Sequence, residues 1–312
     1  MSISFSQHIW PRFRQALAGL MLVLLQVPSQ SYAANLDVLL VLSGNEQPYH
    51  EFATALRQSL PAGIHVSQLD NMAALSEAGQ GAGLIVTVGL KAGEWVAPRT
   101  DKPLLLAMLP SYKYAELQAQ HHSGNPLSAI FVDQPWSRQV SLVRAALPGY
   151  SKVGLLHSPS SNLDIAQLRK LLEQDGTSLI VKTSDPAGSL YASLNSVLSQ
   201  SDVLLAVPDG AIYNSDNIRN ILLSSFRQRV PLIGLSRAYV NAGALCAVYS
   251  TPQDLATQAG AAIAGFARNQ RLPKAQFPHF YNVAINREVA LMLGIRIHSA
   301  AWLKQQLELT EK

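Results

Sequence analysis

The chain is poor in cysteine, in charged residues and in aromatic residues, and each shortage excludes a class of protein. Its 312 residues contain one cysteine, 14% charged residues and 7% aromatic residues. A single cysteine excludes an internal disulfide, and the apolar run around Cys246 is typical of a small buried hydrophobic residue. No run of Lys or Arg is longer than two residues, so the charge pattern predicts no nucleic-acid partner.

Long apolar runs are also lacking, except near the N-terminus. The first 14 residues carry two arginines and no acidic residue, and an apolar run follows at residues 16–27. This run is shorter than the roughly 20 residues that a membrane-spanning helix needs. Together with the small residues before Ala34, the pattern predicts a secretory signal peptide over residues 1–33, with an uncleaved N-terminal anchor as the alternative.

Removal of the signal peptide changes the charge balance of the chain. It takes away Arg12 and Arg14 and leaves 22 basic residues against 20 acidic ones, so the remaining chain is close to neutral. Export without disulfides indicates a bacterial envelope protein that is stabilised by its own hydrophobic core. We therefore expect a periplasmic protein of the Gram-negative envelope, and a monomer.

Short apolar runs without polar alternation recur along the rest of the chain and are typical of strands buried on both faces. Amphipathic stretches lie between them, and alternation of strand and helix indicates parallel sheets with helical crossovers. The predicted strands are residues 36–43, 64–69, 83–89, 103–109, 127–133, 152–158, 178–184, 202–208, 231–236 and 245–250. The predicted helices between them include residues 47–60, 134–147, 162–175, 189–200 and 215–229.

Ten strands are many for one sheet, and the strand–loop–helix pattern starts again near residue 150. The sequence therefore predicts an α/β fold of two Rossmann-like lobes with parallel sheets, joined by a multi-strand hinge. The chain is expected to change lobes after Asp133 and to return near Pro252, ahead of an Ala-rich helix. A last strand at residues 280–285 leads into a helix that Asn286 can cap. The predicted lobes are residues 34–133 with 251–276, and residues 134–250 with 277–312.

Ligands of open parallel sheets bind beyond the carboxyl ends of the strands. The residues at these positions are mostly Ser, Gly and Asn, which can hydrogen-bond a small polar ligand, and the free N–H groups of the following helices favour an anionic group. We expect a cleft between the lobes that closes over a ligand. The predicted ligand-binding residues are Ser43, Gly44, Asn45, Gly89, Leu90, Pro110, Ser158, Ser160, Asp209, Tyr213 and Ser236.

Asp209 and Tyr213 carry the most chemical information in this set. A carboxylate at the mouth of a cleft pairs with an ammonium group of a ligand, whereas Asp-Gly is also a common turn pair, so a turn is the alternative role of Asp209. Tyr213 can stack on a ligand, and the alternative is a half-buried structural tyrosine.

Signals for catalysis, cofactors and metals are weak. Residues 79–83 (GQGAG) precede their strand and lack the glycine spacing of a dinucleotide loop, so they indicate a flexible turn. His121 and His122 have no third ligand at a suitable spacing. The chain has no G-x-S-x-G, H-E-x-x-H or P-loop motif. The sequence therefore predicts no catalytic residue, no metal and no cofactor.

The second half of the chain contains an ordered series of short motifs. Their positions are Pro208, Asp209, Val230, Pro231, Gly243, Ala244, Ile285, Asn286, Ala290 and Leu293 to Ile295. This series resembles, in the same order, the ABC transporter substrate-binding proteins of the type I periplasmic-binding-protein fold, in the branch that includes aromatic amino-acid binders. Residues 146–161 also resemble the segment that opens the second lobe of that family.

The first lobe departs from the family pattern in three loops. Leu90 stands where the family has Thr or Ser, and residues 108–112 and 125–129 replace two loops that hold the ligand carboxylate in the family. The resemblance implies a solute-binding protein that delivers a small organic molecule to a membrane permease, with an amino-acid-like compound as a candidate ligand. Two alternatives remain at this point: a ligand-sensing subunit for a membrane signalling protein, and an exported hydrolase with a serine nucleophile.

Overall fold

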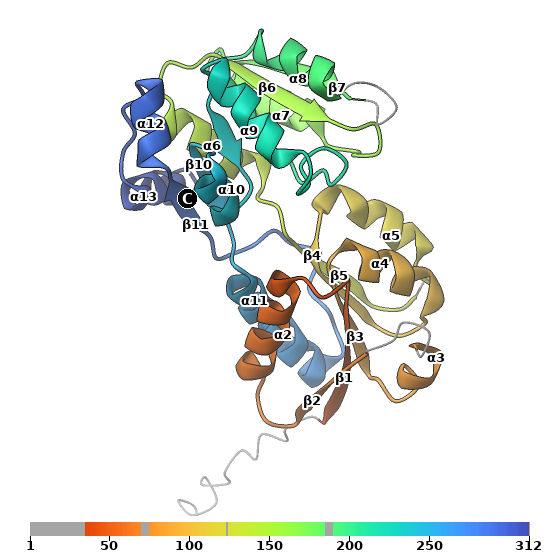
Figure 1. Cartoon of the computed structure of the whole chain (residues 1–312). Helices are drawn as coiled ribbons and strands as arrows, with labels where there is room; N and C mark the ends of the chain where they lie inside the picture. Colours follow the sequence, from red (N-terminus) through yellow and green to blue (C-terminus); the bar gives the residue numbers. More distant parts are fainter. Residues whose placement is uncertain (1–34, 70–74, 123, 185–189, 312) are drawn as a thin grey trace, which may run out of the picture. The chain divides into compact units, whose positions relative to one another are not determined.

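The computed structural model describes residues 35–69, 75–122, 124–184 and 190–311 (Figure 1). The predicted signal peptide, residues 1–33, lies outside the described residues. Within them, the chain forms two separate β-sheets, each with helices against its faces. All ten predicted strands are present, most within one or two residues of the predicted bounds.

The first sheet has five strands in the order β2-β1-β3-β4-β5, and every pair is parallel. The order places β1 in the interior and brings the carboxyl ends of β1, β3, β4 and β5 to one edge. The strands are β1 (Leu36–Leu42), β2 (Ile64–Gln68), β3 (Leu84–Val88), β4 (Leu104–Leu109) and β5 (Leu127–Phe131).

Alternate residues of β1 enter different hydrophobic clusters, because successive side chains of a strand point to opposite faces. Val38 and Leu40 pack with helices α2 (Gln47–Ser59) and α11 (Pro252–Asn269), whereas Leu39 and Val41 belong to the cluster on the other face. The elements on that second face are α3 (Leu75–Ala78), α4 (Leu90–Val96), η2 (Ala97–Arg99), η3 (Ser111–Lys113) and α5 (Tyr114–Gln120).

The second sheet has six strands in the order β11-β10-β9-β8-β6-β7. Its strands and helices share a hydrophobic core that includes the buried Cys246. Its strands are β6 (Lys152–His157), β7 (Ser178–Thr183), β8 (Val203–Leu205), β9 (Leu232–Gly234), β10 (Cys246–Tyr249) and β11 (Asn282–Ile285). Its helices are α6 (Trp136–Ala146), α7 (Ile165–Glu173), α8 (Leu190–Leu198), α9 (Ile218–Arg227), α10 (Arg237–Ala242), α12 (Arg287–Leu293) and α13 (Ala300–Thr310).

Two details differ from the prediction. Strand β8 ends at Leu205 rather than at residue 208, because the chain turns where the Asp209 N–H donates to the Val207 carbonyl. Strand β11 begins at Asn282 and runs antiparallel to β10. The chain reaches β11 directly from α11, which packs on the first sheet, so no helix of the second sheet connects β10 to β11. This connection permits the antiparallel direction of β11.

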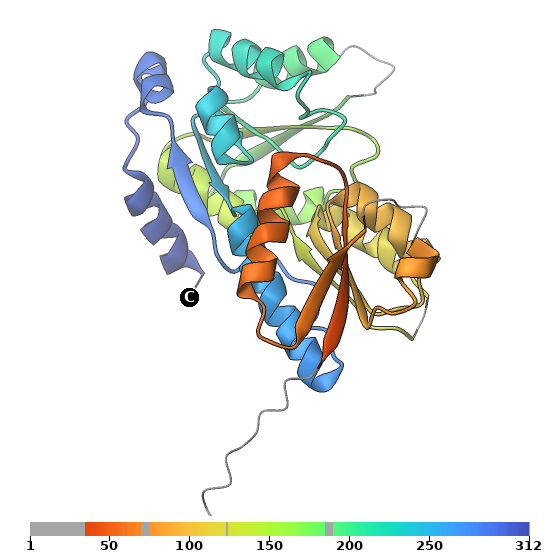
Figure 2. The same cartoon turned by 60° about the horizontal axis from the view of Figure 1, so that its bottom comes forward.

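The chain passes between the two sheets three times, and hydrogen bonds join the three connecting segments. Gln134 Nε2 donates to Ser250 Oγ at 3.0 Å, and Ser250 Oγ donates to the Phe280 carbonyl at 2.6 Å. Helix α11 returns to the first sheet and lies beside α2 (Figure 2). Its N-terminus is fixed by a capping box of Thr251 and Asp254.

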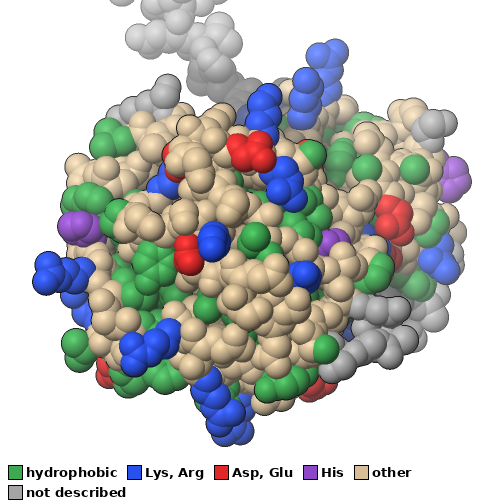
Figure 3. Space-filling view, turned by 90° about the horizontal axis from the view of Figure 1, so that it is seen from above, with side chains coloured by type: hydrophobic (Ala, Val, Ile, Leu, Met, Phe, Trp, Pro, Cys, Tyr) green, Lys and Arg blue, Asp and Glu red, His purple; other side chains and the backbone are tan. Residues whose placement is uncertain are grey.

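The surface carries dispersed charge. On the face shown in Figure 3, Lys and Arg side chains are spread among polar groups rather than gathered in one patch. No helix in the part of the chain that the structure describes has both the length and the apolar composition required to cross a bilayer.

Candidate functional site

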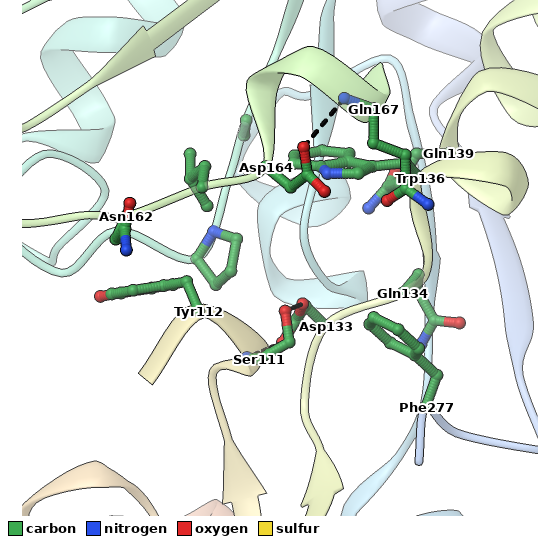
Figure 4. Close-up of a pocket in the computed structure, with 13 residues that line it drawn as sticks. Ser111, Tyr112, Asp133, Gln134, Trp136, Gln139, Asn162, Asp164, Gln167 and Phe277 are labelled. Carbon is green, nitrogen blue, oxygen red and sulfur yellow. Dashed lines mark hydrogen bonds between the residues drawn. The ribbon is translucent and has the colours of Figure 1, made fainter. Parts of the chain in front are cut away.

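A pocket of about 180 Å³ lies where residues of both sheets meet (Figure 4). The first sheet contributes the segments that follow β4 and β5, and the second sheet contributes the segments that follow β6 and β8, together with the start of α6. The pocket thus lies beyond the carboxyl ends of parallel strands, as expected for this class of fold. Its lining consists of Ser111, Tyr112, Asp133, Gln134, Trp136, Gln139, Asn162, Leu163, Asp164, Gln167, Ala206, Pro208 and Phe277.

Asp133 is the carboxylate on the first-sheet side of the pocket. Its Oδ1 accepts a hydrogen bond from the Ser111 N–H at 2.7 Å, and its Oδ2 accepts one from Ser111 Oγ at 2.5 Å (Figure 4). Burial raises the pKa of Asp133 to about 6, although the two bonds from Ser111 act in the opposite direction. No Lys, Arg or His is among the residues that line the pocket beside this carboxyl group.

Gln134 and Arg138 form the polar layer behind Asp133. Arg138 Nη1 donates to Gln134 Oε1 at 2.6 Å, and Arg138 Nε donates to Glu311 at 2.5 Å. The Arg138 guanidinium also lies 3.9 Å from the centre of the Tyr281 ring. The charge of Arg138 is therefore paired away from the pocket.

The first turn of α6 supplies Trp136 and Gln139. Trp136 is half-buried and places an aromatic ring in the pocket lining. Gln139 is 4% exposed, and its Oε1 has no hydrogen-bond partner among the described residues. A buried amide oxygen without a donor is unfavourable by roughly 1–3 kcal/mol, which a ligand N–H or O–H group can offset.

The second sheet contributes a second carboxylate, Asp164, which is exposed. It caps α7 by accepting a hydrogen bond from the Gln167 N–H at 2.9 Å (Figure 4). Tyr112 and Phe277 add two more aromatic rings to the lining. Burial raises the pKa of the Tyr112 hydroxyl, and the nearby negative charge of Asp209 raises it further.

None of the eleven residues predicted to bind a ligand lines this pocket, and those after β1 and β3 contact one another instead. Ser43 Oγ accepts a hydrogen bond from the Ala92 N–H at 2.9 Å. Gly89 has a φ of 87°, and a Cβ there would lie 2.6 Å from Ser43 Oγ. Gly44 and Leu90 are half-buried and Asn45 is exposed.

The predicted residues after β6 and β8 form one hydrogen-bonded group. Asp209 is 2% exposed, and its Oδ2 accepts from the Ser158 N–H at 2.6 Å while its Oδ1 accepts from the Ala211 N–H at 3.0 Å. Ser158 Oγ and Ser160 Oγ are 2.8 Å apart. The turn role that the sequence left open for Asp209 is thus present in the structure, and a ligand contact of Asp209 stays a prediction.

The remaining predicted residues also have structural contacts. Tyr213 is 6% exposed, and its backbone carbonyl accepts a hydrogen bond from Tyr239 Oη at 2.9 Å. Ser236 caps α10 by accepting a hydrogen bond from the Tyr239 N–H at 3.4 Å. Pro110 directly precedes Ser111 of the pocket. Their ligand contacts likewise stay predictions.

Sequence reasoning did not select Asp133, Trp136, Gln139 or Asp164. Asp133 ends a predicted strand, so the rule that selected Asp209 could also have selected it. Trp136 and Gln139 lie in a predicted helix, and nothing in their spacing separates a pocket residue from a core residue.

A family model for ABC transporter substrate-binding proteins matches residues 78–305, which is well over half of the chain. The chain belongs to this family. The resemblance noted in the sequence is thereby confirmed, as is the predicted two-lobed α/β fold. None of the curated protein sequences matches that of this substrate-binding protein.

Solved structures of low sequence identity share the fold of this substrate-binding protein. A conserved domain protein from Vibrio cholerae has 16% identity and a TM-score of 0.64, with 86% of this chain and 97% of that chain covered. An ABC domain from Streptococcus pneumonia in complex with L-Trp has 17% identity, a TM-score of 0.64 and the same coverage. A ligand-free, open substrate-binding protein with adhesive properties from Clostridium difficile has 12% identity and a TM-score of 0.66, with 85% and 96% covered.

Proposed function

We propose that this substrate-binding protein captures a small organic molecule in the pocket and delivers it to an ABC-type importer. The observation that carries the proposal is the pocket itself, because its aromatic and polar lining comes from both lobes. A ligand held by both lobes favours their closed arrangement, which is how a two-lobed protein couples binding to a change of shape. We further propose that the protein acts in the periplasm as a monomer, after export by a signal peptide over residues 1–33.

The proposed lobes are residues 34–133 with 251–276, and residues 134–250 with 277–312. The packing of α11 on β1 and α2 supports this division. Trp136 and Tyr112 would contact the apolar part of the ligand, and Gln139 would hydrogen-bond its polar part. This role requires binding without chemical conversion, and the neighbour in complex with L-Trp is consistent with a ligand of amino-acid size.

The test is thermal and chemical unfolding of the purified chain with a mixed panel of amino acids, including L-tryptophan, together with amines and sugars. A ligand that binds only the folded state at a concentration of 100 Kd raises the free energy of unfolding by about 2.7 kcal/mol. Trp136→Ala should weaken binding of the stabilising compound at least tenfold.

The matched control is Trp302→Ala. Trp302 lies on α13, is 36% exposed and stacks on His298 with ring centres 3.9 Å apart, outside the pocket lining. Its removal should leave ligand affinity unchanged. Equal effects of the two substitutions, or a panel without any stabilising compound, would argue against the proposed function.

A further inference from the structure

We infer that the ligand of this pocket is an organic cation with N–H donors, namely an ammonium or guanidinium compound that lacks a carboxylate. The inference rests on the proposed function and specifies its substrate class. It follows from the charges of the lining, from an unpaired buried acceptor and from the aromatic rings.

The lining carries negative charge only. Asp133 and Asp164 belong to it, and none of its thirteen residues is Lys, Arg or His. The two cations nearest in sequence are engaged elsewhere: Arg138 binds Glu311, and Lys113 lies between two other carboxylates. The Lys113 Nζ is 3.0 Å from Glu116 and 3.4 Å from Glu94.

Two residues of the lining have acceptor oxygens with unused hydrogen-bonding capacity. Gln139 Oε1 is buried and has no hydrogen-bond partner among the described residues. This observation is separate from the argument based on the two carboxylate charges. Asp164 uses Oδ1 to cap α7, so its capacity to accept further hydrogen bonds is available to a ligand. A protonated amine satisfies such a set, because it donates three hydrogen bonds and accepts none.

The aromatic rings favour the same class. The faces of Trp136, Tyr112 and Phe277 carry the negative end of the ring quadrupole, which attracts ammonium and guanidinium groups. The lining therefore combines carboxylates, an amide oxygen and aromatic side chains, which can all stabilise positive charge.

Helix α6 provides the opposing influence, since its N-terminus lies at the pocket. A helix N-terminus is equivalent to about half a positive charge, whereas each ionised carboxylate contributes a full negative charge. The N-terminus of α7 offsets about half of the charge of Asp164, which caps it. The two helix ends together supply about one positive charge against the two carboxylates, so the balance remains negative, and a ligand carboxylate would be repelled by Asp133.

The volume limits the size of the ligand. The pocket has about 180 Å³, and an apolar cavity of about 150 Å³ accommodates benzene. A compound with one ring and a short amine chain is the appropriate probe.

The test uses four compounds that share a phenyl ring and a short side chain. They are phenethylamine (cation), 2-phenylethanol (neutral), 3-phenylpropionate (anion) and L-phenylalanine (zwitterion). Calorimetry with the full chain at neutral pH should show phenethylamine binding at least tenfold more tightly than each of the others.

Asp133→Asn and Asp164→Asn should each lower the affinity for phenethylamine about tenfold, with little effect on 2-phenylethanol. Asparagine keeps a hydrogen-bond acceptor at both positions, including the α7 cap.

The control variants remove an equal charge outside the pocket. Asp101→Asn and Asp216→Asn, both at exposed positions, should leave the affinity for phenethylamine unchanged. Binding of L-phenylalanine or 3-phenylpropionate as tight as that of the amine would overturn the inference and still support a solute-binding role. Binding of none of the four would also overturn it, and the mixed panel above would then decide the proposed function separately.

Discussion

Replacement of Asp133 by asparagine tests whether the pocket holds an uncompensated charge. Asp133 receives two hydrogen bonds from Ser111, but no cation lines the pocket beside it. Asparagine has nearly the same shape, its Oδ1 can accept from the Ser111 N–H, and its Nδ2 can donate to Ser111 Oγ. Asp133→Asn should therefore stabilise the ligand-free protein at neutral pH.

The magnitude follows from the pKa of Asp133. Burial raises this pKa from 3.8 to about 6, and each pKa unit corresponds to about 1.4 kcal/mol, which gives about 3 kcal/mol. Asp133 is partly open to the pocket, where water screens its charge, so we expect about 2 kcal/mol.

The sign depends on pH. A carboxyl group with a raised folded-state pKa lowers stability as pH rises from its unfolded to its folded pKa, and the loss is complete above the folded value. The advantage of Asp133→Asn should be below about 0.5 kcal/mol at about pH 4 and should reach its full size above about pH 6.5.

The assay is urea unfolding of the ligand-free wild-type and variant proteins at several pH values between these limits. Asp101→Asn, at an exposed position, is the control and should change the free energy of unfolding by less than about 0.5 kcal/mol at each pH. A variant less stable than wild type at neutral pH, or an advantage independent of pH, would refute the assignment of Asp133 as an uncompensated buried charge.

Two further substitutions test contacts away from the pocket, again by urea unfolding. Gly89→Ala should lower the free energy of unfolding by about 2 kcal/mol or more, because Gly89 has a φ of 87° and an added Cβ would lie 2.6 Å from Ser43 Oγ. Gly81→Ala, with no neighbouring atom within 4 Å, is its control, and equal effects would contradict the reasoning. Asp209→Ala should lower stability by about 2–3 kcal/mol without ligand, because the N–H groups of Ser158 and Ala211 lose their acceptor. An unchanged stability would leave ligand contact as the remaining explanation for this carboxylate.

The sequence predicted the fold well because its signals are local. Runs such as residues 36–42 are apolar at nearly every position, and this pattern arises when both faces of a strand are covered. The antiparallel direction of β11 could not be predicted in the same way. It depends on the connection before β11, in which the chain returns to the first sheet through α11, and this connection is a property of the tertiary fold.

The pocket was less predictable, although the rule of strand ends pointed to the correct edge of each sheet. That rule does not distinguish a polar residue that lines the pocket from one that is buried among its neighbours. Asp209 and Asp133 both follow strands, and each accepts two hydrogen bonds from nearby loop residues. Asp209 is nevertheless 2% exposed and outside the pocket lining, whereas Asp133 belongs to the lining. Only the spatial arrangement of the loops separates them.

The position of α11 in the chain has a consequence for the order of folding. Leu255, Ile263 and Phe266 complete the hydrophobic cluster on one face of the first sheet, yet they are synthesised after β10 of the second sheet. A nascent chain that ends near residue 133 would leave that face exposed to water, and a chain that ends near residue 250 would still lack β11 of the second sheet. Neither half therefore has all of its elements until α11 and β11 have been synthesised, so formation of the two cores is tied to the last third of the chain.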